Sequence, residues 1–167
     1  SAASDVYKRQ VSAGIKEVWF AKKDRSYLMP CVLLGDSRKT LDLQKEADFS
    51  EFLQGEIKSY DTNSPWYRWR TTVSEKQLQQ FISEKIKSRY EKNPTQIQTK
   101  QKDGTFFSTG QTELGEIKKV EILKRGKSGV AVMAQITGSK NTLRIYTEYN
   151  LRNLFGGEKL ILSLIHI

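Results

Sequence analysis

The segment Pro65–Arg70, which reads PWYRWR, concentrates residue types that bind ring-shaped or anionic ligands. Its aromatic side chains offer faces on which sugar rings or nucleobases stack, and its guanidinium groups hold anions or hydroxyls. On a strand, Tyr67 and Trp69 would share one face. Trp66 and Arg68 would share the opposite face. Two interpretations stay open, a ligand-binding surface and a strand that buries one of its two faces in the core.

A second group of residues that could do chemistry is acidic. An enzyme that cleaves glycosidic bonds needs a carboxyl group whose raised pKa lets it protonate the leaving oxygen. None of the candidates lies in a distinctive motif, and glutamates at strand edges are usually solvated. The candidates are Asp61, Glu113, Glu116, Glu121 and Glu148.

Other catalytic and metal-binding patterns are weak. The turns KRGKSG and TGSKN are rich in lysine and glycine, but they lack the spacing G-x-x-x-x-G-K-[ST] of a phosphate-binding loop, and hairpin turns explain them better. Cys31 is the single cysteine and lies in an apolar run, which favours a small buried side chain over a reactive thiol. We therefore expect no metal site and no cofactor.

The single histidine, His166, lies in a terminal segment whose origin is unusual. The peptide DVYKRQ at residues 5–10 and the peptide LSLIHI at residues 162–167 can be encoded by the two strands of one DNA sequence, which resembles a transposase end used in sequencing libraries. We therefore expect residues 1–10 and 162–167 to be adapter-derived. Residues 11–161 would then be an internal part of a longer protein, and His166 would have no catalytic role.

The formal net charge is +9, which favours a polyanionic partner such as nucleic acid, anionic lipid or a cell-wall polymer. A solvated lysine-rich surface explains the charge equally well. The apolar and aromatic content is typical of a folded chain, and no apolar run approaches the roughly 20 residues that span a bilayer.

The elements that would position these residues indicate an α+β fold. The clearest is an amphipathic helix over residues 75–92, which begins at a capping box of Ser74 and Gln77. Shorter helices are predicted near residues 48–54, with Asp48 as a candidate cap, and near residues 149–155. Short strands are predicted over residues 11–35, and alternating apolar residues predict an antiparallel β meander from about residue 115 to residue 149. The apolar stripe of the main helix comprises Leu78, Phe81, Ile82, Ile86 and Tyr90, and the polar residues Lys76, Gln79, Gln80 and Lys87 fall on the other face.

The order of these segments resembles the SpoIID/LytB family of bacterial cell-wall proteins. Members of that family carry an aromatic P-x-Y-x-W segment, a helix, a G-x-I-x-x-I motif that runs into R-x-x-S-G-R, and a terminal I-R-x-x-L/F. The corresponding segments here are Trp66–Trp69, Gly115–Val130 and Leu151–Phe155. Arg125 stands at the position of the family's arginine, whereas Val130 replaces the arginine that usually follows the glycine. The resemblance covers most of residues 65–155.

The resemblance implies a lytic transglycosylase that acts on peptidoglycan glycan strands in the bacterial cell envelope, in sporulation or cell-wall remodelling. Its catalytic glutamate would lie upstream of residue 11 and its glycine-rich G-H-G-x-G stretch beyond residue 161, so no catalytic residue is assigned in this chain. Any membrane anchor would belong to missing N-terminal sequence. The resemblance also implies that the substrate-binding residues near the glycan groove are Trp66, Tyr67, Arg68 and Trp69.

Two alternatives remain. One is a non-enzymatic, LytB-like module that binds glycan or enhances an amidase or another cell-wall hydrolase. The other is a basic nucleic-acid-binding domain, suggested by the charge and the aromatic residues. Of these partners, we expect peptidoglycan glycan strands rather than nucleic acid.

Overall fold

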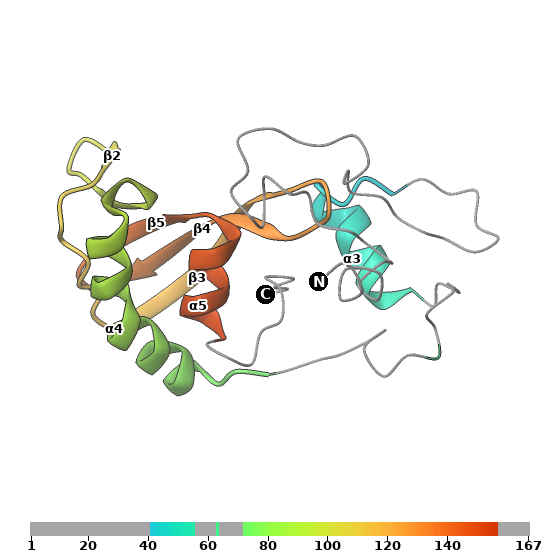
Figure 1. The fold of residues 1–167 in the computed structure, drawn as a ribbon, viewed down its shortest axis with the longest axis horizontal. Helices are drawn as coiled ribbons and strands as arrows, with labels where there is room; N and C mark the ends of the chain where they lie inside the picture. Colours follow the sequence, from blue (N-terminus) through green and yellow to red (C-terminus); the bar gives the residue numbers. More distant parts are fainter. Residues whose placement is uncertain (1–40, 56–62, 64–71, 157–167) are drawn as a thin grey trace. The chain divides into compact units, whose positions relative to one another are not determined.

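A computed structural model of the chain describes residues 41–55, 63 and 72–156 (Figure 1). The described residues fall into two compact units. The first unit contains residues 41–55, residue 63 and the turn 125–130, and the second unit contains residues 72–124 and 131–156. The strands predicted over residues 11–35 lie outside the described residues.

The second unit is built on a five-stranded antiparallel sheet with the strand order β2-β1-β5-β4-β3. The meander predicted from the alternating residues is confirmed as three consecutive strands. The bounds are β1 Ile97–Lys100, β2 Phe106–Phe107, β3 Ile117–Arg125, β4 Ala131–Gly138 and β5 Thr142–Tyr146. The sequence pattern did not predict the pairing of β5 with β1, which joins the meander to the β1–β2 hairpin.

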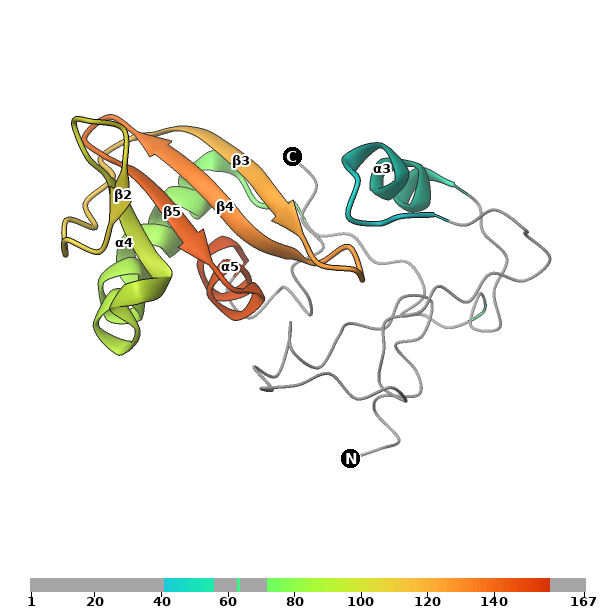
Figure 2. The ribbon, with the colours of Figure 1, turned by 90° about the horizontal axis from the view of Figure 1, so that it is seen from above.

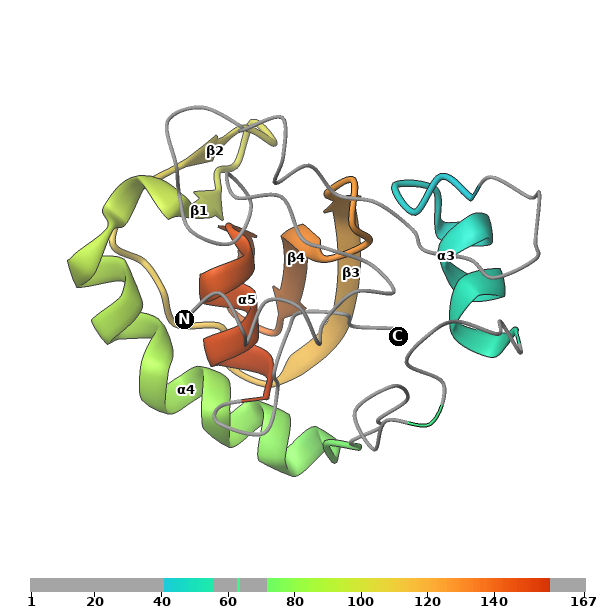
Figure 3. The ribbon, with the colours of Figure 1, turned by 45° about the vertical axis from the view of Figure 1, so that its right-hand side comes forward.

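Two helices pack against each other on one face of this sheet, as Figures 2 and 3 show. Helix α4 spans Glu75–Lys92 and begins at the predicted capping box, in which the Ser74 side chain accepts from the Gln77 backbone N–H and the Gln77 side chain accepts from the Ser74 N–H. Helix α5 spans Glu148–Phe155 and ends at Gly156. A short 3₁₀ helix, η2, spans Pro94–Gln96 between α4 and β1.

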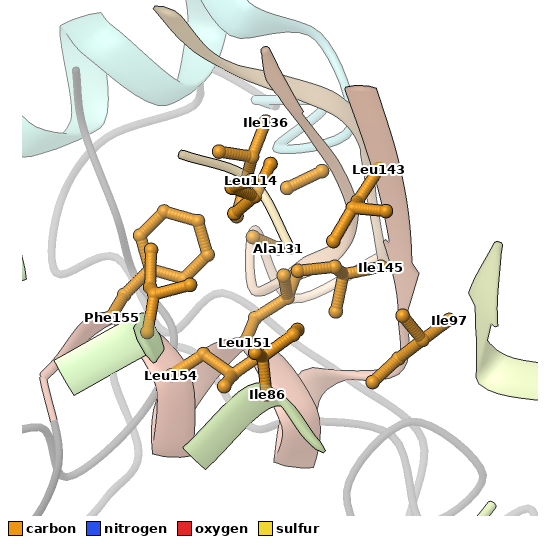
Figure 4. Close-up of a cluster of buried hydrophobic side chains, with 12 residues drawn as sticks. Ile86, Ile97, Leu114, Ala131, Ile136, Leu143, Ile145, Leu151, Leu154 and Phe155 are labelled. Carbon is orange, nitrogen blue, oxygen red and sulfur yellow. The ribbon is translucent and has the colours of Figure 1, made fainter. Parts of the chain in front are cut away.

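The core of the second unit lies between the helices and the sheet (Figure 4). Ile82 and Ile86 from the predicted stripe of α4 are buried there, and Leu78 and Tyr90 pack at its margin. The sheet and α5 supply side chains that are fully enclosed, among them Ala134, Ile136, Leu143, Ile145, Leu151 and Leu154.

Gln79 corrects the prediction for α4. The sequence pattern placed Gln79 on the solvent side with Lys76, Gln80 and Lys87, but its amide is half-buried and bonds the chain just before β3. Nε2 donates to the carbonyl of Gly115 at 2.8 Å, and Oε1 accepts from the N–H of Ile117 at 2.9 Å. One side chain therefore fixes the start of β3 to the helix.

The β4–β5 turn and the segment before β3 approach each other closely. The Gly138 N–H donates to the Asn141 carbonyl, which confirms a hairpin turn, and Lys140 N–H donates to the Leu114 carbonyl. A Cβ atom at Gly138 would lie 2.1 Å from the Leu114 carbonyl oxygen. A Cβ atom at Gly115, whose φ is +70°, would lie 2.2 Å from the Ser139 hydroxyl. Both positions therefore require glycine.

The first unit contains helix α3, Glu46–Gln54, which begins two residues before the predicted bound. Asp48 is not its cap, which corrects that prediction. The N-cap residue is Lys45, and Asp48 lies in the first turn, where its Oδ2 accepts from the Asp42 N–H at 2.8 Å. Phe52 packs with Leu41 and Leu43 in a small apolar cluster.

No helix within the described ranges is long and apolar enough to cross a membrane.

Candidate functional site

The aromatic segment that sequence analysis singled out lies outside the described residues. Its members Trp66, Tyr67, Arg68 and Trp69 are therefore still predicted, and not observed, to bind substrate. Asp61, Cys31 and His166 also lie outside the described residues. The candidate site must be built from the side chains that the structure does place.

Three members of the acidic set form ion pairs. Glu113 and Lys140 pair at 2.6 Å on the surface, and Lys119 and Glu121 pair at 2.7 Å along β3. Glu148 is fully buried at the start of α5, on the helix side of the sheet, and pairs with Arg152 at 3.2 Å. Glu116 is exposed. Glu113 and Glu116 both lie in the segment before β3, next to the β4–β5 turn, whereas Glu121 lies on β3 and Glu148 on α5.

The R-x-x-S-G motif has a structural role in the first unit. The Arg125 guanidinium is 2 % exposed and donates to both carboxylate oxygens of Glu46, at 2.6 and 2.9 Å. It also donates to the Gly129 carbonyl at 3.0 Å and lies 3.7 Å from the centroid of the Phe49 ring. This fork of charge-assisted bonds ties the turn 125–130 to α3. The motif predicted as a hairpin turn is therefore confirmed as one that is anchored by its arginine.

The face of the sheet opposite α4 and α5 carries a row of polar and aromatic side chains. Along β5, the buried residues Leu143 and Ile145 alternate with partly exposed residues on the opposite face, as strand geometry requires. The register places Arg144 beside Gln98 of β1 on one side and beside Gln135 of β4 on the other. We call this surface the open face, defined by Gln98, Lys100, Phe106, Met133, Gln135, Arg144 and Tyr146.

Arg144 lies at the centre of the open face and is held in place by two contacts. Its guanidinium lies 3.8 Å from the centroid of the Phe106 ring, and its Nε donates to Gln135 Oε1 at 3.3 Å. Next to it, the Tyr146 hydroxyl donates to Gln98 Oε1 at 3.1 Å. The open face thus combines aromatic surface with a fixed cation and oriented amides.

The charge of the open face is positive. The strands β1, β2, β4 and β5 contain Lys100 and Arg144 but no aspartate or glutamate. On β3, the carboxylate of Glu121 is neutralised by Lys119. Flat aromatic surface, hydrogen-bond donors and positive charge together suit a ligand with planar or ring-shaped faces and many oxygen acceptors.

In the described part of the chain, no three histidine, cysteine, aspartate or glutamate side chains gather as a metal site. The open-face residues were not among the sequence candidates. Their signal was present in TLRIY at residues 142–146, where every second residue is polar or amphipathic, but strand pairing was needed to bring Gln98 and Gln135 beside Arg144.

Comparison with known proteins gives one match. No curated protein and no solved structure matches the chain. One family model, described as "Domain of unknown function (DUF8618)", matches residues 13–105. The match includes α3, α4 and β1 and ends before β2, so part of the open face lies beyond it. The family's description assigns no activity, and the resemblance to SpoIID/LytB proteins stays a prediction. Because the match covers more than half of the 167 residues, the chain belongs to the DUF8618 family.

Proposed function

We propose that this chain binds peptidoglycan glycan strands as part of a SpoIID-like lytic transglycosylase of the bacterial cell envelope, with the catalytic glutamate outside the chain. The observation that carries the proposal is the open face, on which Phe106 and Tyr146 accompany the fixed guanidinium of Arg144. Sugar rings stack their apolar faces on aromatic side chains, and their hydroxyls accept from amide and guanidinium donors.

The order of the elements supports the same proposal. The capped helix α4, the meander β3–β5 and the short helix α5 follow one another along the chain in the order in which SpoIID-like proteins carry the corresponding motifs. Arg125, which stands at the position of the family's arginine, is a buried anchor. The spacing of the R-x-x-S-G motif therefore has a structural reason, and the motif does not itself supply a catalytic group.

A non-enzymatic cell-wall module is the second candidate. It is favoured by the acidic residues of the second unit, because Glu113, Glu121 and Glu148 are each held in an ion pair with a lysine or arginine. Such a module would hold a glycan strand for an amidase or another cell-wall hydrolase.

Co-sedimentation of the full chain with purified glycan strands tests glycan binding. We expect Phe106→Ala to weaken binding roughly tenfold, because loss of an aromatic stacking surface costs about 1–3 kcal/mol. The adjacent Phe107→Ala is the matched control, since Phe107 is 59 % exposed and pairs with Thr99, whose side chain lies on the buried side. Equal effects of the two substitutions, or no binding by the unsubstituted chain, would contradict the proposal.

Two further measurements separate the alternatives. A nucleic-acid-binding domain would retain single-stranded oligonucleotides with an affinity that falls steeply with salt, and such retention without glycan binding would replace the proposal. The chain itself should release no anhydro-sugar ends from peptidoglycan. Release of such ends would show that an acid within residues 1–167 does the chemistry.

The segment Trp66–Trp69 is a second proposed glycan contact. Comparison of Trp66→Ala with Trp69→Ala reports which side of this segment contacts the ligand. If the segment is a strand, Trp66 and Trp69 lie on opposite faces, because side chains alternate along a strand. Loss of binding in one variant alone supports a strand with one ligand face. Unchanged binding in both variants removes this segment from the proposed contact.

A further inference from the structure

We infer that Arg144 makes the open face selective for glycan strands whose sugars carry a carboxylate. The inference rests on the proposed function and deepens it, because it assigns the specificity of the same surface to one side chain. It follows from how the guanidinium is held, from the charge around it and from the donors beside it.

The first step is the orientation of the guanidinium. Its Nε is used by Gln135 Oε1, and its planar face is covered by the Phe106 ring. Among the described residues no hydrogen bond or ion pair engages its two terminal nitrogens. These two N–H groups form the end of the guanidinium fork, and a carboxylate accepts from such a pair through both oxygens.

The second step concerns the acids that could compete for Arg144 within its own and its neighbouring strands. The strands that flank Arg144, β1 and β4, contain no aspartate or glutamate, and neither does β5 itself. Elsewhere in the second unit a surface cation does have such a partner, since Lys140, in the turn after β4, pairs with Glu113. Arg144 therefore offers its charge to a ligand rather than to the protein.

The third step is the orientation of the two neighbouring side-chain amides. Because the Arg144 Nε–H can only donate, Gln135 must present Oε1 to it, which leaves the Gln135 NH₂ group as a donor. Gln98 likewise uses Oε1 to accept from the Tyr146 hydroxyl and keeps its NH₂ group. The row across the three strands is thus rich in donors, and such a surface discriminates in favour of an anionic, acceptor-rich ligand.

Peptidoglycan supplies such a group. Muramic acid bears a lactyl ether whose carboxylate is free when no peptide is attached to it, whereas a strand of N-acetylglucosamine alone has no carboxylate. Charge-assisted hydrogen bonds are about twice as strong as neutral ones. We therefore expect the full chain to bind carboxylate-bearing strands roughly tenfold more tightly than the same strands after their carboxyl groups are converted to methylamides.

The experiment measures the affinity of the full chain for peptide-free muramic-acid strands, for the amidated strands and for chitin oligosaccharides. Arg144→Gln should abolish the preference for the carboxylate, so that the variant binds the muramic-acid strands and their amidated form with the same affinity. Arg144→Lys keeps the charge but loses the planar fork, so it should retain a smaller preference. Lys87→Gln, which removes one positive charge from the exposed side of α4, is the control and should keep the full preference.

The outcomes separate the two proposals. If the unsubstituted chain binds all three glycans equally, or if Arg144→Gln keeps the tenfold preference, the role of Arg144 is wrong while glycan binding stands. If no glycan is bound, the proposed function itself fails, and the inference fails with it. Circular dichroism of each variant establishes that the fold is retained, and Arg144→Lys provides the test should Arg144→Gln not fold.

Discussion

The two faces of the second unit's sheet are made from the same strands and differ in almost every physical respect. On the helix side, Leu143 and Ile145 have no exposed surface and pack with residues of α4 and α5. On the open face, Arg144 and Tyr146, which alternate with them along β5, remain partly exposed and make polar contacts across strands. Alternate residues of one strand therefore supply the core and the surface that we propose as the ligand-binding face.

The apolar residues of β5 fix its register. A shift of one residue would turn Leu143 and Ile145 to solvent and bury Arg144, so the core determines where the guanidinium points. The polar residues need not stabilise the fold to be placed accurately. Substitutions on the two faces should therefore have separable effects on stability and on binding.

The largest expected effect is on the helix side. Leu143→Ala should lower the free energy of unfolding by about 2–5 kcal/mol, because it removes a fully buried side chain and leaves a cavity. Arg144→Ala, one residue along, should lower it by less than about 1 kcal/mol. Urea unfolding followed by circular dichroism measures both values. Equal losses would mean that the open face contributes to stability as much as the core does, and would contradict the separation of the two faces.

Glycine substitutions extend the comparison to the turns. Gly138→Ala should cost about 3 kcal/mol, since the new Cβ would meet the backbone oxygen of the core residue Leu114. Gly104→Ala, in the β1–β2 turn, is the control. Its φ of +86° makes alanine strained, but a Cβ atom there meets nothing within 4 Å, so about 1 kcal/mol is expected. Thermal unfolding of both variants checks the order, and a larger loss at Gly104 would contradict the close approach at Gly138.

Two glutamines, Gln79 on α4 and Gln135 on the open face, provide a further test of this difference. Gln79→Ala removes the partners of the Gly115 carbonyl and the Ile117 N–H, and should cost about 2 kcal/mol. Gln135→Ala on the open face should leave the free energy of unfolding within about 0.5 kcal/mol of its original value but weaken carboxylate-dependent glycan binding. Urea titrations and glycan affinities of the two variants form the test. A stability loss at Gln135 equal to that at Gln79 would remove the distinction.

Sequence reasoning predicted the fold through local signals. The capping box at Ser74 and Gln77 and the apolar stripe with Ile82 and Ile86 specify α4, because helix signals are contained within a few turns of chain. Alternation and glycine-containing turns likewise specify the meander. Asp48 was misassigned because an acidic residue in the first turn of a helix fits the same sequence pattern as an N-cap residue. The structure distinguishes the two roles, since the Asp48 carboxylate accepts from the Asp42 N–H, which precedes the helix.

The candidate site could not be predicted in the same way because its residues meet only through strand pairing. Gln98 and Tyr146 are 48 residues apart in the chain and bond across β1 and β5. Nothing local to either residue encodes that register, and the pairing of β5 with β1 follows from how the whole sheet closes over its core. The role of Gln79 was missed for a related reason, since its partners lie more than 30 residues downstream.

The smallest effect is expected in the exposed β1–β2 turn, where Asp103 Oδ1 accepts from the Thr105 hydroxyl at 2.6 Å and from the Thr105 N–H at 2.9 Å. These bonds favour the carboxylate, so the hydroxyl bond first and the backbone bond second lower the pKa of Asp103 below its ordinary value. A lowered pKa in the folded chain means that the stabilisation is present above the pKa of the unfolded chain and is lost as the pH falls through the folded value.

Thr105→Ala should raise the pKa of Asp103 only part of the way to its ordinary value, because the backbone donor remains. An NMR titration of the Asp103 carboxyl carbon measures the change, with Thr95→Ala, which removes a hydroxyl bonded to Asn93, as the control. A midpoint that does not move in Thr105→Ala would show that the hydroxyl does not hold this carboxylate. Because a raised pKa means a smaller pH-dependent stabilisation, Thr105→Ala should also narrow the difference between the free energies of unfolding at neutral and at acidic pH.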